Sequence, residues 1–274
     1  MRRLLDRCRS VGSGRGESQD RGFILIVVIS AIGILAVVAA SFAQITTSHV
    51  RAVASNVQSA GAEALADAGV PLSADTRKPE LMREAAAAGA KIASCPAALA
   101  PACDIVVTLV VDHKQTDAIL FGADGAIHTL RPDSVVMLSS TLAPEYVVNA
   151  AQRLAARAVR LLDAPVSGGP ARALQGTMSM MLAGASATYA QCADVLTAIA
   201  NPILRVSERI GDGARMKLVN NMLAAANWVA GCEAFALGAK LGLDAQTMLD
   251  VIGASSGASW IVPERIPRAL ANDF

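Results

Sequence analysis

The sequence is poor in aromatic residues, and this shortage limits what its core can contain. Only 3% of the 274 residues are Phe, Trp or Tyr, whereas 53% are hydrophobic. A chain of this length is long enough for one large domain or two smaller ones. We therefore expect a core built mainly from Ala, Val, Leu and Ile side chains.

The sequence also lacks a charge excess and any clustered metal ligands. Its 24 basic and 23 acidic residues give a formal net charge of +1, which removes the electrostatic argument for a nucleic-acid partner. Cysteine and histidine are few and scattered, without the paired spacing of a zinc site or a disulfide framework (Cys8, Cys95, Cys103, Cys192, Cys232, His49, His113 and His128). We expect buried thiols in a reducing compartment and no metal site.

The N-terminal region divides into a polar leader and a long apolar run. Residues 1–22 carry six arginines against three acids, and residues 23–43 contain no charge. At ~1.5 Å per helical residue, the apolar run is long enough to cross a bilayer core. A buried helix of a soluble protein is the alternative, but the arginine-rich flank favours a membrane helix with its N-terminus in the cytoplasm.

This N-terminal region resembles a type II secretion pseudopilin. The likeness rests on Arg21-Gly22-Phe23, where a prepilin peptidase would cut after Gly22, and on the apolar run that follows. Val27 occupies the position at which most pilins carry glutamate, a departure shared by the minor pseudopilin K subunit. The resemblance implies a pseudopilin-like helix over residues 23–69 and a single-pass location in the inner membrane.

Beyond residue 70, strands and helices alternate along the sequence. The clearest strand is CDIVVTLVV at residues 103–111, a continuous apolar run of the kind buried in parallel sheets. Strands are expected at residues 70–75, 103–111, 134–139 and 159–163, and helices at 79–89, 115–121 and 144–156. This alternation predicts an α/β fold with a Rossmann-like, doubly wound parallel sheet over residues 70–185, followed by an all-α domain over 186–274.

The glycine-rich turn of a dinucleotide-binding fold is missing from its expected place. If Asp75 ends the second strand and holds a ribose, the Gly-x-Gly-x-x-Gly turn should lie about twenty residues earlier. Residues 53–58 read VASNVQ instead, and their side chains would block close approach of phosphates. The cofactor domain is therefore predicted to be incomplete. Asp75 favours NAD over NADP, whereas Arg77 favours NADP.

Two later motifs carry residues suited to chemistry. Ser167-Gly168-Gly169 follows a strand and precedes a helical turn, so its amides and hydroxyl can converge on a carboxylate, although a plain tight turn has the same shape. Lys217 and Asn221 stand four apart in an apolar helical pattern, which places both on one helix face. They can hold a substrate hydroxyl between them, and a solvated lysine is the alternative.

Both motifs resemble the β-hydroxyacid dehydrogenases, the family of 3-hydroxyisobutyrate, tartronate semialdehyde and 6-phosphogluconate dehydrogenases. The matching stretches are CDIVVTLVVDHKQTDAILFG, SSTLAP, DAPVSGGPARALQGTMSMMLAG and GDGARMKLVNNMLAAANWVAGCEAFALGAKLGLD, within residues 68–274. The resemblance implies a nicotinamide domain, a helical substrate domain, a small hydroxy-acid substrate and a homo-oligomer. It assigns the following roles: Lys217 as general acid/base, Asn221 as its partner, Ser167, Gly168 and Gly169 as carboxylate ligands, and Leu109, Val110, Val111 and Thr141 along the cofactor.

The ends of the chain differ from the family pattern. Pseudopilin-like sequence replaces the first strand and the glycine turn, and the helical domain is predicted to be truncated at Phe274. These features predict a chimera of a pseudopilin start and a cytoplasmic dehydrogenase body, with impaired activity. The alternative function is a membrane-anchored pseudopilin fragment carrying a non-catalytic passenger.

Overall fold

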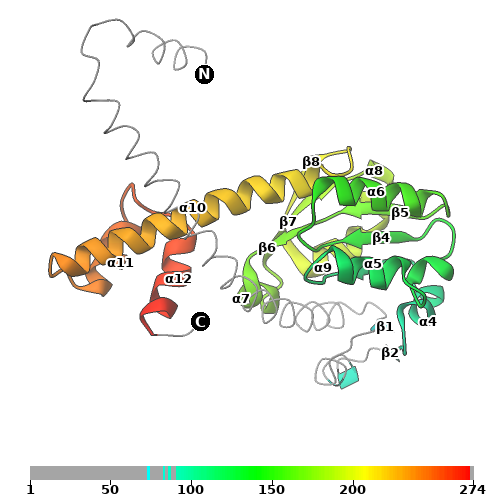
Figure 1. Cartoon of the computed structure of the whole chain (residues 1–274), viewed down its shortest axis with the longest axis horizontal. Helices are drawn as coiled ribbons and strands as arrows, with labels where there is room; N and C mark the ends of the chain where they lie inside the picture. Colours follow the sequence, from blue (N-terminus) through cyan, green and yellow to red (C-terminus); the bar gives the residue numbers. More distant parts are fainter. Residues whose placement is uncertain (1–72, 75–82, 84–85, 88–90, 272–274) are drawn as a thin grey trace, which may run out of the picture. The chain divides into compact units, whose positions relative to one another are not determined.

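The computed structural model describes residues 73–74, 83, 86–87 and 91–271 (Figure 1). The polar leader, the apolar run at 23–43 and the VASNVQ segment lie outside the described residues, as do Asp75 and Arg77. The predictions made for those segments therefore remain predictions.

One half of the main sheet consists of three parallel strands, as the alternating pattern predicts. They are β3 (Ile105–Thr108), β4 (Val135–Leu138) and β5 (Arg160–Asp163). Every residue of β4 is buried, because helices cover both faces of this part of the sheet. The predicted strand at 103–111 is shorter than expected, since residues after Thr108 turn away from the sheet.

The second half of the sheet is mixed, a detail that the prediction of a doubly wound parallel sheet does not include. Strand β7 (Met178–Ala183) runs antiparallel to β5 and to β6 (Val166–Ser167), while β8 (Ala200–Ser207) runs parallel to β7. Only the short helix α7 (Gly169–Leu174) separates β6 from β7, and a parallel crossover needs a longer connection. The sheet extends to Ser207, so the predicted domain boundary at residue 185 falls inside it.

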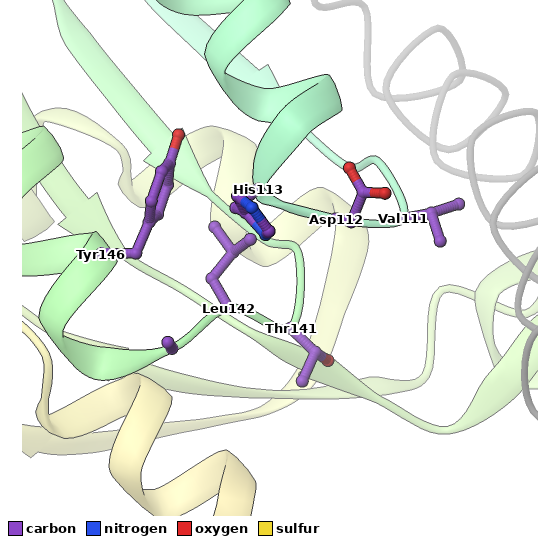
Figure 2. Close-up of a pocket in the computed structure, with 7 residues that line it drawn as sticks. Val111, Asp112, His113, Thr141, Leu142 and Tyr146 are labelled. Atoms are coloured by element: carbon purple, nitrogen blue, oxygen red, sulfur yellow. The ribbon is translucent and has the colours of Figure 1, made fainter. Parts of the chain in front are cut away.

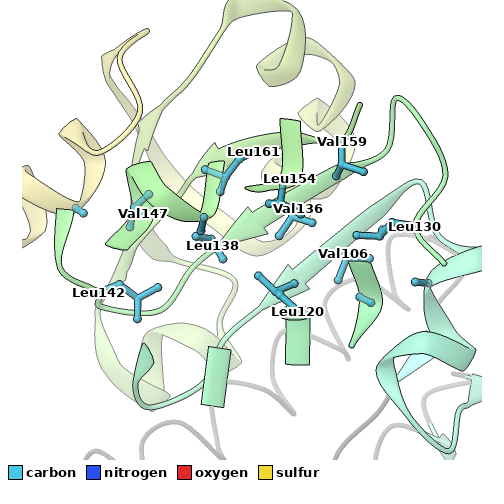
Figure 3. Packing of buried hydrophobic residues seen from close by; sticks show 14 residues of the cluster. Val106, Leu120, Leu130, Val136, Leu138, Leu142, Val147, Leu154, Val159 and Leu161 are labelled. Carbon is cyan, nitrogen blue, oxygen red and sulfur yellow. The ribbon is translucent and has the colours of Figure 1, made fainter. Parts of the chain in front are cut away.

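Helices pack on both sides of the sheet and create two separate hydrophobic clusters. One contains Val136, Leu138 and Leu154 (Figure 3), and the other contains Met137 and Leu162, whose side chains leave the opposite face of the same strands. The helices of this region are α4 (Pro96–Leu99), α5 (His113–Phe121), α6 (Pro144–Ala155), α8 (Ser186–Gln191) and α9 (Ala193–Ile199), with 3-10 turns η1 (Ala100–Ala102) and η2 (Ala126–His128). The result is a three-layer α/β sandwich.

A second, two-stranded parallel sheet is formed by β1 (Ser73–Ala74) and β2 (Lys91–Ile92). In a classic dinucleotide fold the strand order is 3-2-1-4-5-6, with the glycine-rich turn following the first strand. Here β1 and β2 pair with each other, and among the described strands β3 pairs with β4 alone, so the other edge of β3 has no described partner.

The remainder of the described chain is helical. Helix α10 (Asp212–Lys240) confirms the helical pattern predicted around Lys217 and Asn221, and α11 (Ala245–Gly253) and α12 (Ile261–Leu270) pack against it. Phe235, Met248 and Val262 are buried together where these helices meet. Within the described part of the chain, α10 alone is long and apolar enough to cross a membrane, a test that core helices of soluble proteins also pass. A Rossmann-like sheet followed by a helical region confirms the predicted fold class.

Candidate active site

The three parallel strands of the sheet end side by side, which brings their following loops to one edge. Thr108 pairs with Leu138, and Leu138 pairs with Asp163, each at the last position of its strand. The loops after β3 and β4 are joined where the Val110 amide donates a 2.8 Å hydrogen bond to Ser140 Oγ. Ligands of open α/β sheets bind at this edge, beyond the carboxyl ends of the strands.

A pocket of about 350 Å³ lies between the first two of these loops (Figure 2). It is lined by Val111, Asp112, His113, Thr141, Leu142, Ala143 and Tyr146. Two predicted cofactor residues, Val111 and Thr141, therefore line one cavity. Leu109 and Val110 directly precede it and are half-buried.

The pocket also contains side chains that the sequence motifs do not indicate. His113 opens α5, where Asp112 caps the helix by accepting a 2.8 Å hydrogen bond from the Gln115 amide. Tyr146 comes from α6, and its ring centroid lies 6.1 Å from that of His113. The tyrosine hydroxyl donates to Asp117, and burial together with that carboxylate raises the pKa of Tyr146 above its ordinary value. Only the tertiary arrangement brings these rings together, so no local pattern reveals them.

The Ser167-Gly168-Gly169 turn adopts a backbone conformation that requires glycine. Gly168 has φ +137° and Gly169 has φ +70°, both in the region that side chains disfavour. A Cβ at Gly168 would also lie 3.0 Å from the Arg172 side chain. Ser167 is half-buried, and its carbonyl accepts a 3.2 Å hydrogen bond from Ser179 Oγ on β7. This hydrogen bond holds the turn against the sheet, so the turn is not a fully solvent-exposed loop.

Lys217 is buried in the second turn of α10, with only 7% of its surface exposed. Burial lowers the pKa of its ammonium group to about 8, because removal from water disfavours the charged form. No described side chain forms an ion pair or hydrogen bond with it. Asn221 lies one turn further along the helix and is exposed, so the two predicted partners differ in depth.

A buried carboxylate joins the end of β5 to the start of α10. Asp163, the last residue of β5, is 1% exposed and accepts hydrogen bonds from the amides of Gly211 (3.0 Å) and Ala214 (3.1 Å). Burial raises the pKa of Asp163 to about 6, although the amide hydrogen bonds act in the opposite direction. In the sequence, the only sign of this role is that an acid ends an apolar strand.

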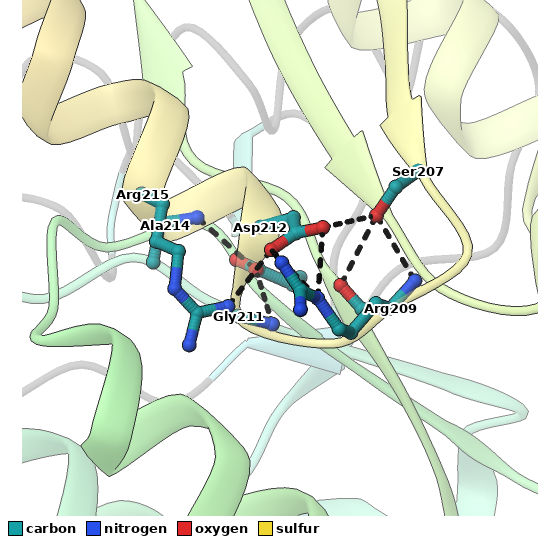
Figure 4. Close-up of polar contacts among 7 residues, drawn as sticks. Ser207, Arg209, Gly211, Asp212, Ala214 and Arg215 are labelled. Atoms are coloured by element: carbon teal, nitrogen blue, oxygen red, sulfur yellow. Dashed lines mark hydrogen bonds and ion pairs between the residues drawn. The ribbon is translucent and has the colours of Figure 1, made fainter.

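A second carboxylate, Asp212, is the first residue of α10 and faces other partners (Figure 4). It accepts hydrogen bonds from Ser207 Oγ (2.7 Å), Arg209 (2.9 Å) and Arg215 (2.8 Å). Hydrogen bonds from these partners, with that from Arg209 the strongest, hold the pKa of Asp212 well below its usual range. In the described part of the chain, no three His, Cys, Asp or Glu side chains gather as metal ligands would.

Comparison with known families identifies the class of this fold and site. Residues 59–211 match the family described as the NAD-binding domain of 6-phosphogluconate dehydrogenase. Residues 211–274 match the family described as NAD-binding of NADP-dependent 3-hydroxyisobutyrate dehydrogenase. The chain therefore belongs to the β-hydroxyacid dehydrogenase family, whose cofactor is NAD or NADP.

Individual relatives agree with this assignment. The chain is 40% identical to L-threonate dehydrogenase of Cupriavidus necator over 213 residues, which are 78% of this chain and 72% of the relative. It is 38% identical to L-threonate dehydrogenase of Pectobacterium atrosepticum, over 65% of this chain and 58% of that one. The crystal structure of a 3-hydroxyisobutyrate dehydrogenase from Salmonella typhimurium superposes with a TM-score of 0.74 at 33% identity, covering 81% of this chain and 77% of that chain. The match to the first family begins at residue 59 and so overlaps the last part of the predicted pseudopilin-like helix at 23–69.

The described pocket fits a binding place for part of the family's NAD or NADP cofactor. The pocket lies at the sheet edge where such folds bind their ligands, and Thr141 lines it. Two residues earlier, the Ser139 hydroxyl is buried and has no hydrogen-bond partner among the described residues, which leaves a polar group for a ligand to satisfy. The segment expected to hold the pyrophosphate lies outside the described residues.

Proposed function

We propose that this protein is an NAD(P)-dependent dehydrogenase that oxidises the hydroxyl group of a small hydroxy acid such as L-threonate. The observation that carries the proposal is Lys217, a buried lysine without a partner in the described chain and with a pKa near 8. A general base works best when its pKa lies near the operating pH. The L-threonate dehydrogenases among the relatives supply the substrate class.

The mechanism assigns proton transfer to Lys217. In the direction of oxidation, its free amine takes the hydroxyl proton while the carbinol carbon loses hydride, and in reduction its ammonium returns the proton. The bound nicotinamide supplies the hydride acceptor or donor. Asn221, one turn along α10, holds the same hydroxyl by a hydrogen bond. Burial of Lys217 keeps water from competing for the proton.

The substrate carboxylate is assigned to the Ser167-Gly168-Gly169 turn. The backbone amides and the serine hydroxyl of this turn are the groups assigned to the carboxylate, and glycine at two positions leaves no Cβ to block its approach. Leu109, Val110 and Thr141 are assigned to the cofactor, together with Asp75 and Arg77. A related structure, the 3-hydroxyisobutyrate dehydrogenase of Mycobacterium tuberculosis, is described with L-serine, which carries both a hydroxyl and a carboxylate.

The substrate assignment predicts that turnover depends on the carboxylate. The purified chain should reduce NAD⁺ or NADP⁺ with L-threonate and should show little turnover of threitol, the alcohol in which a hydroxymethyl group replaces the carboxylate. Loss of a charge-assisted contact costs roughly 1.5–3 kcal/mol, or about a tenfold to hundredfold loss of kcat/KM. NADH fluorescence titration in parallel separates failed cofactor binding from failed substrate recognition. Equal kcat/KM for both compounds would contradict the assignment of the turn.

We further propose that the chain forms a homo-oligomer through the exposed apolar face of α10. Leu218, Val219, Met222 and Leu223 are 47–72% exposed within two turns of that helix. Contiguous apolar surface of this kind marks an interface.

Sedimentation measurements test the oligomer. The chain should sediment with the mass of at least two copies, and the double substitution Met222→Glu/Leu223→Glu should shift it toward a monomer. Leu270→Glu, on α12 and 57% exposed, is the matched control and should leave the mass unchanged. A monomeric wild-type chain at micromolar concentration would contradict the proposal.

A further inference from the structure

Asp163 is a buried carboxylate with no cationic partner. It is 1% exposed, and no described Lys or Arg side chain forms an ion pair with it. A buried charge of this kind is costly unless hydrogen bonds compensate for lost hydration. Here the compensation comes from backbone amides at the start of α10, where the helix dipole also favours a negative group. The buried carboxylate thus lies where the last residue of β5 meets the first turn of α10, the helix that carries Lys217.

Close packing against Asp163 restricts the backbone of the first turn of α10. Gly211 has φ +94°, and its amide hydrogen bond to Asp163 is 3.0 Å long. A Cβ at Gly213 would lie 2.9 Å from Asp163 Cγ and 2.8 Å from the Met181 carbonyl oxygen on β7. The helix backbone at Gly213 therefore lies directly against Asp163, the last residue of β5, and against Met181 of β7.

Asp163 is close in the chain to Ser167, and the helix turn that it contacts is close in the chain to Lys217. It precedes Ser167 by four residues, and Gly213 precedes Lys217 by four residues, which is about one helical turn. A shift in the first turn of α10 would move Lys217 relative to the substrate turn and admit water to its amine.

We propose that Asp163 is a positioning residue: by accepting hydrogen bonds from Gly211 and Ala214, it holds the first turn of α10 so that Lys217 stays buried. The catalytic meaning of this placement rests on the proposed function. The burial of Lys217 is a property of the folded chain, so it can be measured without enzyme turnover.

The experiment measures the ionisation of Lys217 by competitive acetylation over a pH series, followed by mass spectrometry of the full-length chain. In the wild type, Lys217 should be labelled with a midpoint near pH 8. In Asp163→Ala the first turn is released and water reaches the amine, so the midpoint should rise by about one unit or more toward the ordinary value of ~10.4. Lys240, exposed at the other end of α10, is the internal reference and should not change.

Two further variants separate positioning from other roles. Both amide hydrogen bonds end on the same oxygen, Oδ2, so the single side-chain oxygen of Asp163→Asn can accept both and should restore the wild-type midpoint. Asp212→Asn alters the other carboxylate of the same turn, which faces Arg209 and Arg215, and should leave the Lys217 midpoint unchanged. A folded Asp163→Ala chain with the wild-type midpoint would overturn the proposal.

If Asp163→Ala does not fold, native-state hydrogen exchange of the wild-type chain tests the proposal instead. Lys217 labelling and hydrogen exchange of the Gly211 and Ala214 amides should increase together as denaturant is added, because one local opening exposes all three. Labelling of Lys217 while both amides remain protected would overturn the proposal. A shifted midpoint in a chain that shows no L-threonate turnover would leave the positioning role intact and count against the proposed function alone.

Discussion

Replacing Lys217 with alanine should lower kcat for L-threonate oxidation about 10²- to 10⁴-fold, the usual contribution of a general acid/base. Affinity for NADH should change little, because none of the pocket-lining residues comes from α10. The measurement is steady-state formation of NADH by the purified variant, with NADH fluorescence titration alongside. Lys240→Ala, an exposed lysine in the last turn of the same helix, is the matched control and should retain full activity.

Lys217→Arg separates a base from a fixed positive charge. Arginine keeps the charge but remains protonated at every accessible pH, so it cannot take a hydroxyl proton. We expect it to be nearly as inactive as the alanine variant. An active arginine variant would show that Lys217 acts only by charge, and unchanged turnover in Lys217→Ala would remove it from the mechanism.

Gly213→Ala should destabilise the fold although helix propensity predicts the opposite. Alanine in place of glycine within a helix gains about 1 kcal/mol. At Gly213, however, the added Cβ would lie 2.8 Å from the Met181 carbonyl oxygen and 2.9 Å from Asp163 Cγ, and backbone atoms cannot easily retreat. Overpacking of this kind typically costs about 1–3 kcal/mol, so the free energy of unfolding should fall.

Urea unfolding monitored by circular dichroism measures this effect. Gly253→Ala is the control, because it lies at the end of α11 and no atom would approach its Cβ within 4 Å. That substitution should be neutral or slightly stabilising. If Gly213→Ala were as stable as the wild type, the close packing of α10 on the sheet described above would be incorrect.

The parts of the fold that the sequence predicts are those governed by local pattern. The apolar run that contains β3 reads as a buried strand because both of its faces are apolar, and α10 reads as a helix because its apolar residues recur at helical spacing. The same helical spacing predicts that Lys217 and Asn221 lie on one helix. Their difference in exposure depends on where the helix meets the sheet, which spacing alone does not specify.

The features that the sequence does not predict arise from pairing between distant segments. The antiparallel direction of β7 follows from its pairing with Asp163 and with Val166, and no local pattern encodes that choice. Tyr146, which lines the pocket, and Asp163, which accepts hydrogen bonds from the start of α10, likewise have neighbours from distant parts of the sequence. From the sequence alone, Tyr146 looks like an ordinary helix residue and Asp163 like an ordinary strand residue.

The pH dependence of L-threonate oxidation tests the central claim that buried Lys217 is the proton acceptor. Oxidation requires the free amine, so kcat/KM should rise with pH through about 8 and then level off. Measurement from about pH 7 upward keeps Asp163, whose pKa is about 6, ionised throughout. The account predicts this inflection in the wild type and in Lys240→Ala, and its loss from the residual activity of Lys217→Ala. A flat wild-type profile, or the same inflection in Lys217→Ala, would contradict it.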